Sequence, residues 1–262
     1  MKEGDFLLKS LKTKRLGQDF LFFDSLDSTN DYCKNHLASL PDFCCVYADL
    51  QTRGKGRREK SWENKKGTSV AMSLVLKNIP PERLTGLTLI IGLAVKQAAE
   101  ALTGHPSQIK WPNDVLMNHK KICGILCEAV FEGGTACTVC GIGLNILQDS
   151  GFFETAGLRY AGSLLTETGC ILSPLDAAAS VLNELEPLLE LFLRQGFPPL
   201  RQRYKDSCAN LGRESQVFYN NKTIAGTVMD ISESGSLLVD CGGECIEVLS
   251  GDVSVRGLYG YV

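Results

Sequence analysis

The stretch from residue 109 to residue 146 constrains the fold most, because it predicts four β-strands in succession. Its apolar segments are residues 109–111, 115–117, 121–131 and 135–146. Asn118-His119 and Glu132-Gly133-Gly134 lie between them, and residues of these types favour tight turns between antiparallel neighbours. Segments this apolar are not surface loops, so we expect the strands to belong to a buried sheet.

The rest of the first 212 residues predicts a mixture of strands and helices. Strands are expected at residues 20–23, 44–48 and 68–76, and helices at 81–103, 174–195 and 199–208. Ser28 starts another helix, with Asp31 three residues later as its capping partner, and Ser173-Pro174 is a typical helix start. The helix 81–103 carries Leu and Ala at helical spacing, so we expect it to be buried.

The pattern changes after Gly212, where short alternating strands follow one another. The turns between them are Asn220-Asn221, Ser234-Gly235 and Gly242-Gly243. They predict a small five-stranded, SH3-like β-barrel. A chain of 262 residues can hold one large core and a small second one. We therefore place two domains at residues 1–212 and 213–262.

Charge and composition exclude several classes of protein. The net charge is −3, whereas a general nucleic-acid binder usually carries a basic excess. The first residues lead into no apolar segment of the signal-peptide kind, and the apolar run at 90–94 is too short to span a membrane. These features predict a cytoplasmic protein that binds neither DNA nor membranes.

Eleven cysteines, an odd number, lie mostly in apolar surroundings. In a chain of this size they predict buried free thiols in a reducing compartment. Cys137 and Cys140 have the spacing of a metal or redox pair, but residues three apart in a strand point to opposite faces. No ligand set is completed by the three histidines His36, His105 and His119. We therefore expect no permanent metal site.

The segment Lys110-Trp111-Pro112-Asn113-Asp114, with Lys121 and Gly124 shortly after it, brings charges next to buried strands. A lysine in such a place is costly unless an anion or a carboxylate meets it. Gly124 allows a ligand to approach the backbone closely. The alternative is a turn anchored by Trp111, with two lysines that reach the solvent.

A second candidate segment is residues 51–62. Between Arg53 and Lys60 it holds five basic residues and one acid, with Gly54 and Gly56 among them. Glycines allow turns that point successive N–H groups at one anion, and arginines grip carboxylate or phosphate. A solvated loop, a localisation signal or a nucleic-acid patch would have the same composition.

A third segment, Cys140-Gly141-Ile142-Gly143-Leu144-Asn145, is an apolar strand that ends in a carboxamide. It is no dinucleotide-binding fingerprint, because the third glycine is missing and no helix begins there.

Taken in their order along the chain, the three segments resemble the catalytic domain of the biotin protein ligases, which attach biotin to carboxylase carrier domains. Asp27-Ser28-Thr29-Asn30 and Gly251-Asp252-Val253-Ser254-Val255-Arg256 extend the resemblance over residues 16–257. It implies an α+β fold, a mixed β-sheet packed against helices (the biotinyl/lipoyl ligase catalytic fold), with the barrel appended. The residues before Asp24 are too few for the DNA-binding helix-turn-helix domain of bifunctional members, so the resemblance implies the ligase-only form.

The resemblance also implies a biotin pocket. The ureido group of biotin needs both donors and acceptors, which Ser28, Thr29 and Gln51 supply. Helix capping is the alternative role of the two hydroxyls. The implied biotin-binding residues are Ser28, Thr29, Asn30, Gln51, Gly54, Lys55, Gly56, Arg57, Lys121, Gly124 and Leu126.

A neighbouring ATP site follows from the same resemblance, because biotin reacts with ATP to form biotinyl-AMP. Two anions must meet there, so cations are required near both. The implied ATP-binding residues are Lys55, Arg57, Trp62, Lys110, Asn113, Asp114 and Asn145, and the catalytic residues are Lys121, Arg57 and Asp114. Mg2+ should arrive with ATP, with Asp114 as a candidate ligand.

Three residues depart from the common family pattern. Lys55 replaces an arginine, which keeps the charge but loses the fork of donors. Glu59 replaces a glycine, which makes the loop less positive and less flexible, and Leu147 replaces a frequent second asparagine. We expect the reaction to persist with altered nucleotide affinity.

The implied partners are biotin, ATP and the biotin carboxyl carrier domain of acetyl-CoA carboxylase or a related carboxylase, with the enzyme a monomer or a homodimer. A lipoate or octanoate ligase shares the scaffold, but its pocket needs no partners for a urea, so Ser28, Thr29 and Gln51 favour biotin. Further alternatives are a DNA-binding, biotin-responsive regulator, which the acidic balance disfavours, and a protein whose barrel binds peptides.

Overall fold

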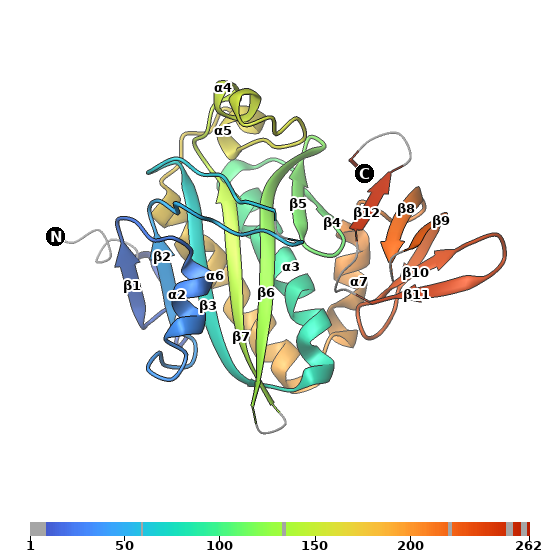
Figure 1. Cartoon of the computed structure of the whole chain (residues 1–262), viewed down its shortest axis with the longest axis horizontal. Helices are drawn as coiled ribbons and strands as arrows, with labels where there is room; N and C mark the ends of the chain where they lie inside the picture. The colour runs from blue at the N-terminus through green and yellow to red at the C-terminus, as the bar shows by residue number, and fades with distance from the viewer. Residues whose placement is uncertain (1–8, 59, 133–134, 220–221, 250–253, 258–260) are drawn as a thin grey trace.

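The computed structural model describes residues 9–58, 60–132, 135–219, 222–249, 254–257 and 261–262. Within them, a seven-stranded sheet in the order β1-β2-β3-β7-β6-β5-β4 forms the centre of the larger part (Figure 1). Its strands are β1 Phe20–Phe23, β2 Cys45–Ala48, β3 Ser69–Ile79, β4 Gln108–Lys110, β5 Asp114–Met117, β6 Lys120–Glu132 and β7 Thr135–Asn145. β1 and β2 are parallel and the other neighbours antiparallel, so the sheet is mixed, as expected.

Helices cover both faces of this sheet. They are α2 Thr29–Asn35, α3 Leu84–Thr103, α4 Ser150–Thr155, α5 Leu164–Thr168, α6 Pro174–Gln195 and α7 Pro198–Ser207, with a 3-10 turn, η1, at Pro81–Arg83. The long helices α3 and α6 pack against each other behind the sheet, whereas α2 lies on the opposite face, against β3 and β7 (Figure 1). The two faces are therefore covered unequally, by the long helices on one and by the short α2 on the other.

Helix α3 is rich in apolar residues, many of them buried. By length and composition the segment Pro81–Thr103 could cross a membrane, but 61% of its apolar 18-residue stretch is buried inside the protein. Gly86 brings α3 close to α6, because a Cβ there would lie 2.7 Å from the ring of Phe192. α3 thus has the surroundings of a core helix, as its Leu and Ala spacing predicted.

The predicted strands of the large sheet are present, with shifted ends. β2 begins at Cys45 rather than Cys44, and β3 continues to Ile79. Asn118 and His119 have φ values of 48° and 65° and form the tight turn between β5 and β6. Gly133 and Gly134 of the second predicted turn lie outside the described residues.

Two short helices, α4 and α5, were not predicted. Each begins at a capping side chain: Asp149 accepts from the N–H of Phe152 over 2.8 Å, and Ser163 forms a reciprocal pair with Thr166. They were missed because six and five residues are too few for a periodic pattern.

The cysteines are free thiols, as predicted. Cys44, Cys45, Cys123 and Cys140 are buried, and Cys127 and Cys137 are half-buried. In the part of the chain that the structure describes, no group of three or more His, Cys, Asp or Glu side chains could hold a metal ion.

A second, antiparallel sheet follows, in the order β11-β10-β9-β8-β12. Its five strands over the described residues are β8 Glu214–Tyr219, β9 Lys222–Ile231, β10 Leu237–Asp240, β11 Cys245–Val248 and β12 Ser254–Gly257. Gly235, Gly242 and Gly243 have positive φ, as the predicted turns require, and Asn220-Asn221 lies outside the described residues. The buried Trp111 donates from Nε1 to the Gly235 carbonyl, 3.0 Å away, and so joins this sheet to the first.

Candidate active site

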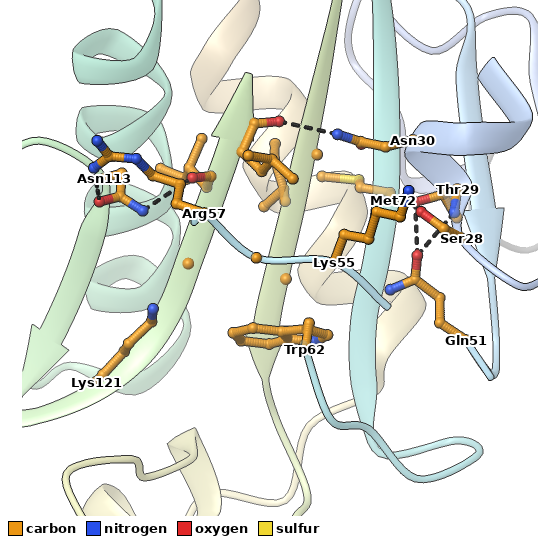
Figure 2. Close-up of a pocket in the computed structure, with 17 residues that line it drawn as sticks. Ser28, Thr29, Asn30, Gln51, Lys55, Arg57, Trp62, Met72, Asn113 and Lys121 are labelled. Carbon is orange, nitrogen blue, oxygen red and sulfur yellow. Dashed lines mark hydrogen bonds between the residues drawn. The ribbon is translucent and has the colours of Figure 1, made fainter. Parts of the chain in front are cut away.

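One cavity on the α2 face of the large sheet collects most of the predicted site residues (Figure 2). Twelve of its lining residues were predicted: Ser28, Thr29, Asn30, Gln51, Lys55, Gly56, Arg57, Trp62, Asn113, Lys121, Gly124 and Leu126. Five were not among the predicted site residues: Met72, Ile125, Gly141, Ile142 and Gly143. Gly54 lines an adjoining hollow formed by the basic loop. Lys110, Asp114 and Asn145 are absent from the wall of the cavity.

The end of the cavity beside α2 is neutral and polar. Gln51 Oε1 accepts from the backbone N–H of Thr29 over 2.8 Å and from its hydroxyl over 3.1 Å. Ser73, which was not predicted, lies with its hydroxyl 2.6 Å from Thr29 Oγ1. Ser28 caps α2 by accepting from the N–H of Asp31 over 3.3 Å, and it also lines the cavity. Capping of α2 and a place in the cavity wall are therefore compatible for Ser28.

Asn30 joins α2 to the sheet beneath it. Its side chain donates to the Leu126 carbonyl over 3.2 Å and to Glu128 over 2.8 Å. A Cβ on Gly141 would lie 2.4 Å from Asn30 Oδ1, so this glycine makes room for the amide. The side chain is buried and its hydrogen bonds go to protein, which makes Asn30 a support of the polar end.

The basic loop, residues 53–62, is held over the cavity at several points. Lys55 pairs with Asp31 over 2.7 Å, and Arg57 donates to Asn113 Oδ1 over 2.8 Å (Figure 2). Burial raises the pKa of Asp31, but Lys55 and Lys34 outweigh it and keep that pKa below its ordinary value. The loop therefore already places two cations at the cavity. Glu59 lies outside the described residues.

Trp62 lies flat on a glycine-lined part of the sheet, between Gln51 and Lys121 (Figure 2). A Cβ on Gly143 would lie 2.5 Å from the indole, and one on Gly124 would lie 3.2 Å from it. The indole Nε1 is buried and has no hydrogen-bond partner among the described residues. A buried donor without a partner is costly, so this N–H is available to a ligand.

Charged side chains gather around Lys121, which lines the opposite end of the cavity. Lys121 Nζ lies 2.7 Å from Asp114 Oδ1, and the hydroxyl of Tyr261 donates to Asp114 Oδ2. Burial raises the pKa of Asp114, but the ammonium groups of Lys121 and Lys110 outweigh it and hold that pKa below its usual value. Burial lowers the pKa of Lys110 to about 8, against the opposing effect of Asp114. This end can thus receive an anion without a large reorganisation of charge.

Known families and solved structures are similar to this chain over most of its length. Residues 22–145 match the Biotin/lipoate A/B protein ligase family, and residues 211–256 match the Biotin protein ligase C terminal domain. The bifunctional ligase/repressor BirA of Bacillus spizizenii is 31% identical over 94% of this chain and 76% of its own length. The chain belongs to the biotin protein ligase family. Membership gives it a ligase activity that joins biotin to protein.

Two further relatives of this ligase are informative. The biotin–[acetyl-CoA-carboxylase] ligase of Mycobacterium tuberculosis is 30% identical over 81% of this chain and 79% of its own. The biotin protein ligase of Aquifex aeolicus, solved in complex with biotin and ATP, superposes with a TM-score of 0.80 at 27% identity and covers 92% of this chain and 99% of its own. The fold expected from the resemblance is confirmed.

Asn145, which we expected to bind ATP, is placed differently in this ligase. Its amide donates to the Gly162 carbonyl over 2.9 Å, and its Oδ1 accepts from Gln148 over 3.0 Å. The side chain is buried at the end of β7, where it orders the chain that leads into α4. The structure therefore gives Asn145 a local partner on each side of its amide and no contact with the cavity.

Proposed function

We propose that this ligase activates biotin with ATP and transfers it to a lysine of a biotin carboxyl carrier domain. The observation that carries the proposal is a single cavity with neutral hydrogen-bonding groups at one end and cations at the other. Thr29 and Gln51 suit the ureido group, and Lys121 with Arg57 suits a carboxylate and a phosphate. Met72, Leu126 and Ile142 also line the cavity, and their apolar side chains suit the apolar body of biotin.

In the first step a carboxylate oxygen of biotin attacks the α-phosphorus of ATP. A new O–P bond forms, the bond between the α-phosphorus and the bridging oxygen breaks, and pyrophosphate leaves. Lys121 neutralises the attacking carboxylate, and Lys110 receives the phosphates. Asp114 keeps the ammonium group of Lys121 in place, because the two side chains pair over 2.7 Å. Preorganised charge of this kind is usually the largest contribution to catalysis.

In the second step the amine of the acceptor lysine attacks the carbonyl carbon of biotinyl-AMP. The C–O bond to phosphate breaks, AMP leaves, and the amine loses a proton. AMP is a stable leaving group, so the enzyme mainly positions the reactants and excludes water. The basic loop serves this purpose, because Arg57 and Trp62 cover the cavity from the same segment.

Mg2+ belongs to the proposal as the companion of ATP. It keeps several waters and binds phosphate with one or two carboxylates, so it needs few protein ligands. Asp114 was the candidate ligand from the protein, but its two oxygens contact Lys121 and Tyr261, so the ion would be held by the phosphates, whose charge it would neutralise.

The remaining parts of the proposal follow from the family and the chain. We infer division into a catalytic domain, residues 1–212, and a C-terminal domain, residues 213–262, action in the cytoplasm, and no binding of DNA. The free thiols support a reducing compartment. The partner is the carrier domain of acetyl-CoA carboxylase or a related enzyme, as the name of the Mycobacterium tuberculosis relative suggests.

A thermal-shift panel with biotin, lipoate and ATP tests the substrate. A ligand that binds only the folded state at about 100 times its Kd stabilises it by about 2.7 kcal/mol. We expect a shift with biotin, a further shift with biotin and ATP together, and none with lipoate. A shift with lipoate but not with biotin would replace this proposal by a lipoate ligase, and biotin-dependent release of pyrophosphate is the matching activity assay.

A further inference from the structure

Tyr261, the second-last residue, reaches the charged end of the active site from the C-terminal part of the chain. It lies beyond residues 211–256, which match the C-terminal family domain. Its hydroxyl donates to Asp114, 147 residues away in sequence. The residue after Tyr261, Val262, packs closely on Gly257. A Cβ at Gly257 would lie 2.3 Å from the backbone carbon of Val262.

The phenol and the ring of Tyr261 contact different charged groups. The hydroxyl binds one oxygen of Asp114 while Lys121 pairs with the other oxygen over 2.7 Å, so the carboxylate is held from two sides. The ring lies over the ammonium group of Lys110, with Nζ 3.4 Å from its centroid. The ring of Tyr261 also stacks on the ring of Tyr160, with centroids 5.3 Å apart and an interplanar angle of 19°.

This arrangement meets a specific need of the charged end. Lys110 is only 6% exposed, and a buried ammonium without partners would lose its proton. An aromatic face attracts a cation and leaves its N–H groups able to donate elsewhere. A hydroxyl that fixes Asp114 prevents the carboxylate from turning away from Lys121. Burial and Asp114 together raise the pKa of Tyr261, so the phenol remains a donor at physiological pH.

We propose that Tyr261 is a positioning residue of the ATP half of the active site: its hydroxyl orients Asp114 toward Lys121, and its ring positions Lys110 for the phosphates. The inference rests on the proposed function, since it assigns ATP to this end. It predicts that the two parts of the side chain act on different kinetic parameters.

The test uses the full-length protein, with Tyr261→Phe, Tyr261→Ala and Tyr32→Phe as variants. Tyr261→Phe loses only the hydroxyl, so kcat for biotin-dependent pyrophosphate release should fall about tenfold with KM for ATP nearly unchanged. Tyr261→Ala also loses the ring, so KM for ATP should rise as well, by about fivefold. Calorimetric affinity for biotin should stay constant in both. Tyr32→Phe removes a hydroxyl from a ring that packs on Phe23 and His36 and should match the parent.

Several results would overturn the assignment. Unchanged kcat in Tyr261→Phe would show that the hydroxyl orients nothing, and a lower KM for ATP in Tyr261→Ala would show that the ring obstructs the nucleotide. Equal losses of biotin affinity, ATP affinity and melting temperature would indicate a purely structural role. If the parent protein itself releases no pyrophosphate with biotin, the proposed function fails, whereas an active parent with insensitive variants removes only the role of Tyr261.

Discussion

At the α2 end of the cavity, Thr29 and Gln51 are neutral, lie 22 residues apart and satisfy one another. At the far end Lys121 lines the cavity, and the charged Lys110 and Asp114 lie beside it, outside the wall, with Tyr261 joining them from the other end of the chain. Neutral groups can be buried in advance when hydrogen bonds pair them. Buried charges need counter-charges in place before the substrate arrives. The cavity thus combines a local, self-contained recognition site with a site assembled from distant segments.

The largest effect is expected from Lys121→Ala, which removes the cation that we propose neutralises the attacking carboxylate. Adenylate formation should lose roughly 3 kcal/mol or more in kcat/KM, because a preorganised charge is removed. Pyrophosphate release with saturating biotin and ATP measures it. Lys120→Ala is the matched control, since Lys120 donates to the Arg159 carbonyl over 2.7 Å and does not line the cavity.

Thermal unfolding of Lys121→Ala should accompany the assay, since the substitution leaves Asp114 without its nearest cation. A folded variant with near-normal pyrophosphate release would exclude Lys121 from neutralising the attacking carboxylate.

Gln51→Leu acts on the neutral end alone. Biotin should bind about 1–3 kcal/mol more weakly, because a buried urea group and Thr29 would lose their partner. ATP binding should be unaffected, and this asymmetry is what separates the two ends. Calorimetry with each ligand measures it, with the exposed Gln202→Leu in α7 as control. Equal weakening of biotin and ATP would show that the ends are not independent.

The smallest effect is a pH dependence at the charged end. The pKa of Lys110 is about 8, so its ammonium is lost as pH rises through 8, and KM for ATP should rise by up to about tenfold per unit above it. The unfolded chain keeps that proton to higher pH, so folding stability should increase over the same range. Comparing KM for ATP at pH 7–9 with Lys110→Arg, which stays charged, is the measurement. Parallel profiles would exclude Lys110 as the cause.

The sequence predicted polar residues of both ends, but neither Met72 and Ile142 of the apolar lining nor the contact from Tyr261. Ser28, Thr29 and Gln51 are polar residues beside predicted helix and strand ends, so the neighbouring sequence is enough to single them out. Met72 and Ile142 were missed because an apolar residue in a strand has the same signature whether it lines a pocket or fills the core. Tyr261 was missed because no local pattern reports a contact over 147 residues.

The fold shows the same division. Strands and long helices have periodic patterns, so β1 to β7, α3, α6 and α7 were predicted to within a few residues. Asn145 shows the limit of motif reasoning, because its position was predicted and its partners were not. Gln148 and Gly162 occupy its amide, and both come from a connection for which the sequence predicts no structure.

The indole that rests on Gly143 has a consequence for inhibitor discovery. With Trp62 in that position the cavity measures only about 50 Å³, enough for a few waters, whereas pockets for small molecules are typically about 300–1,000 Å³. An inhibitor that fills this site must therefore contact or displace the indole of Trp62.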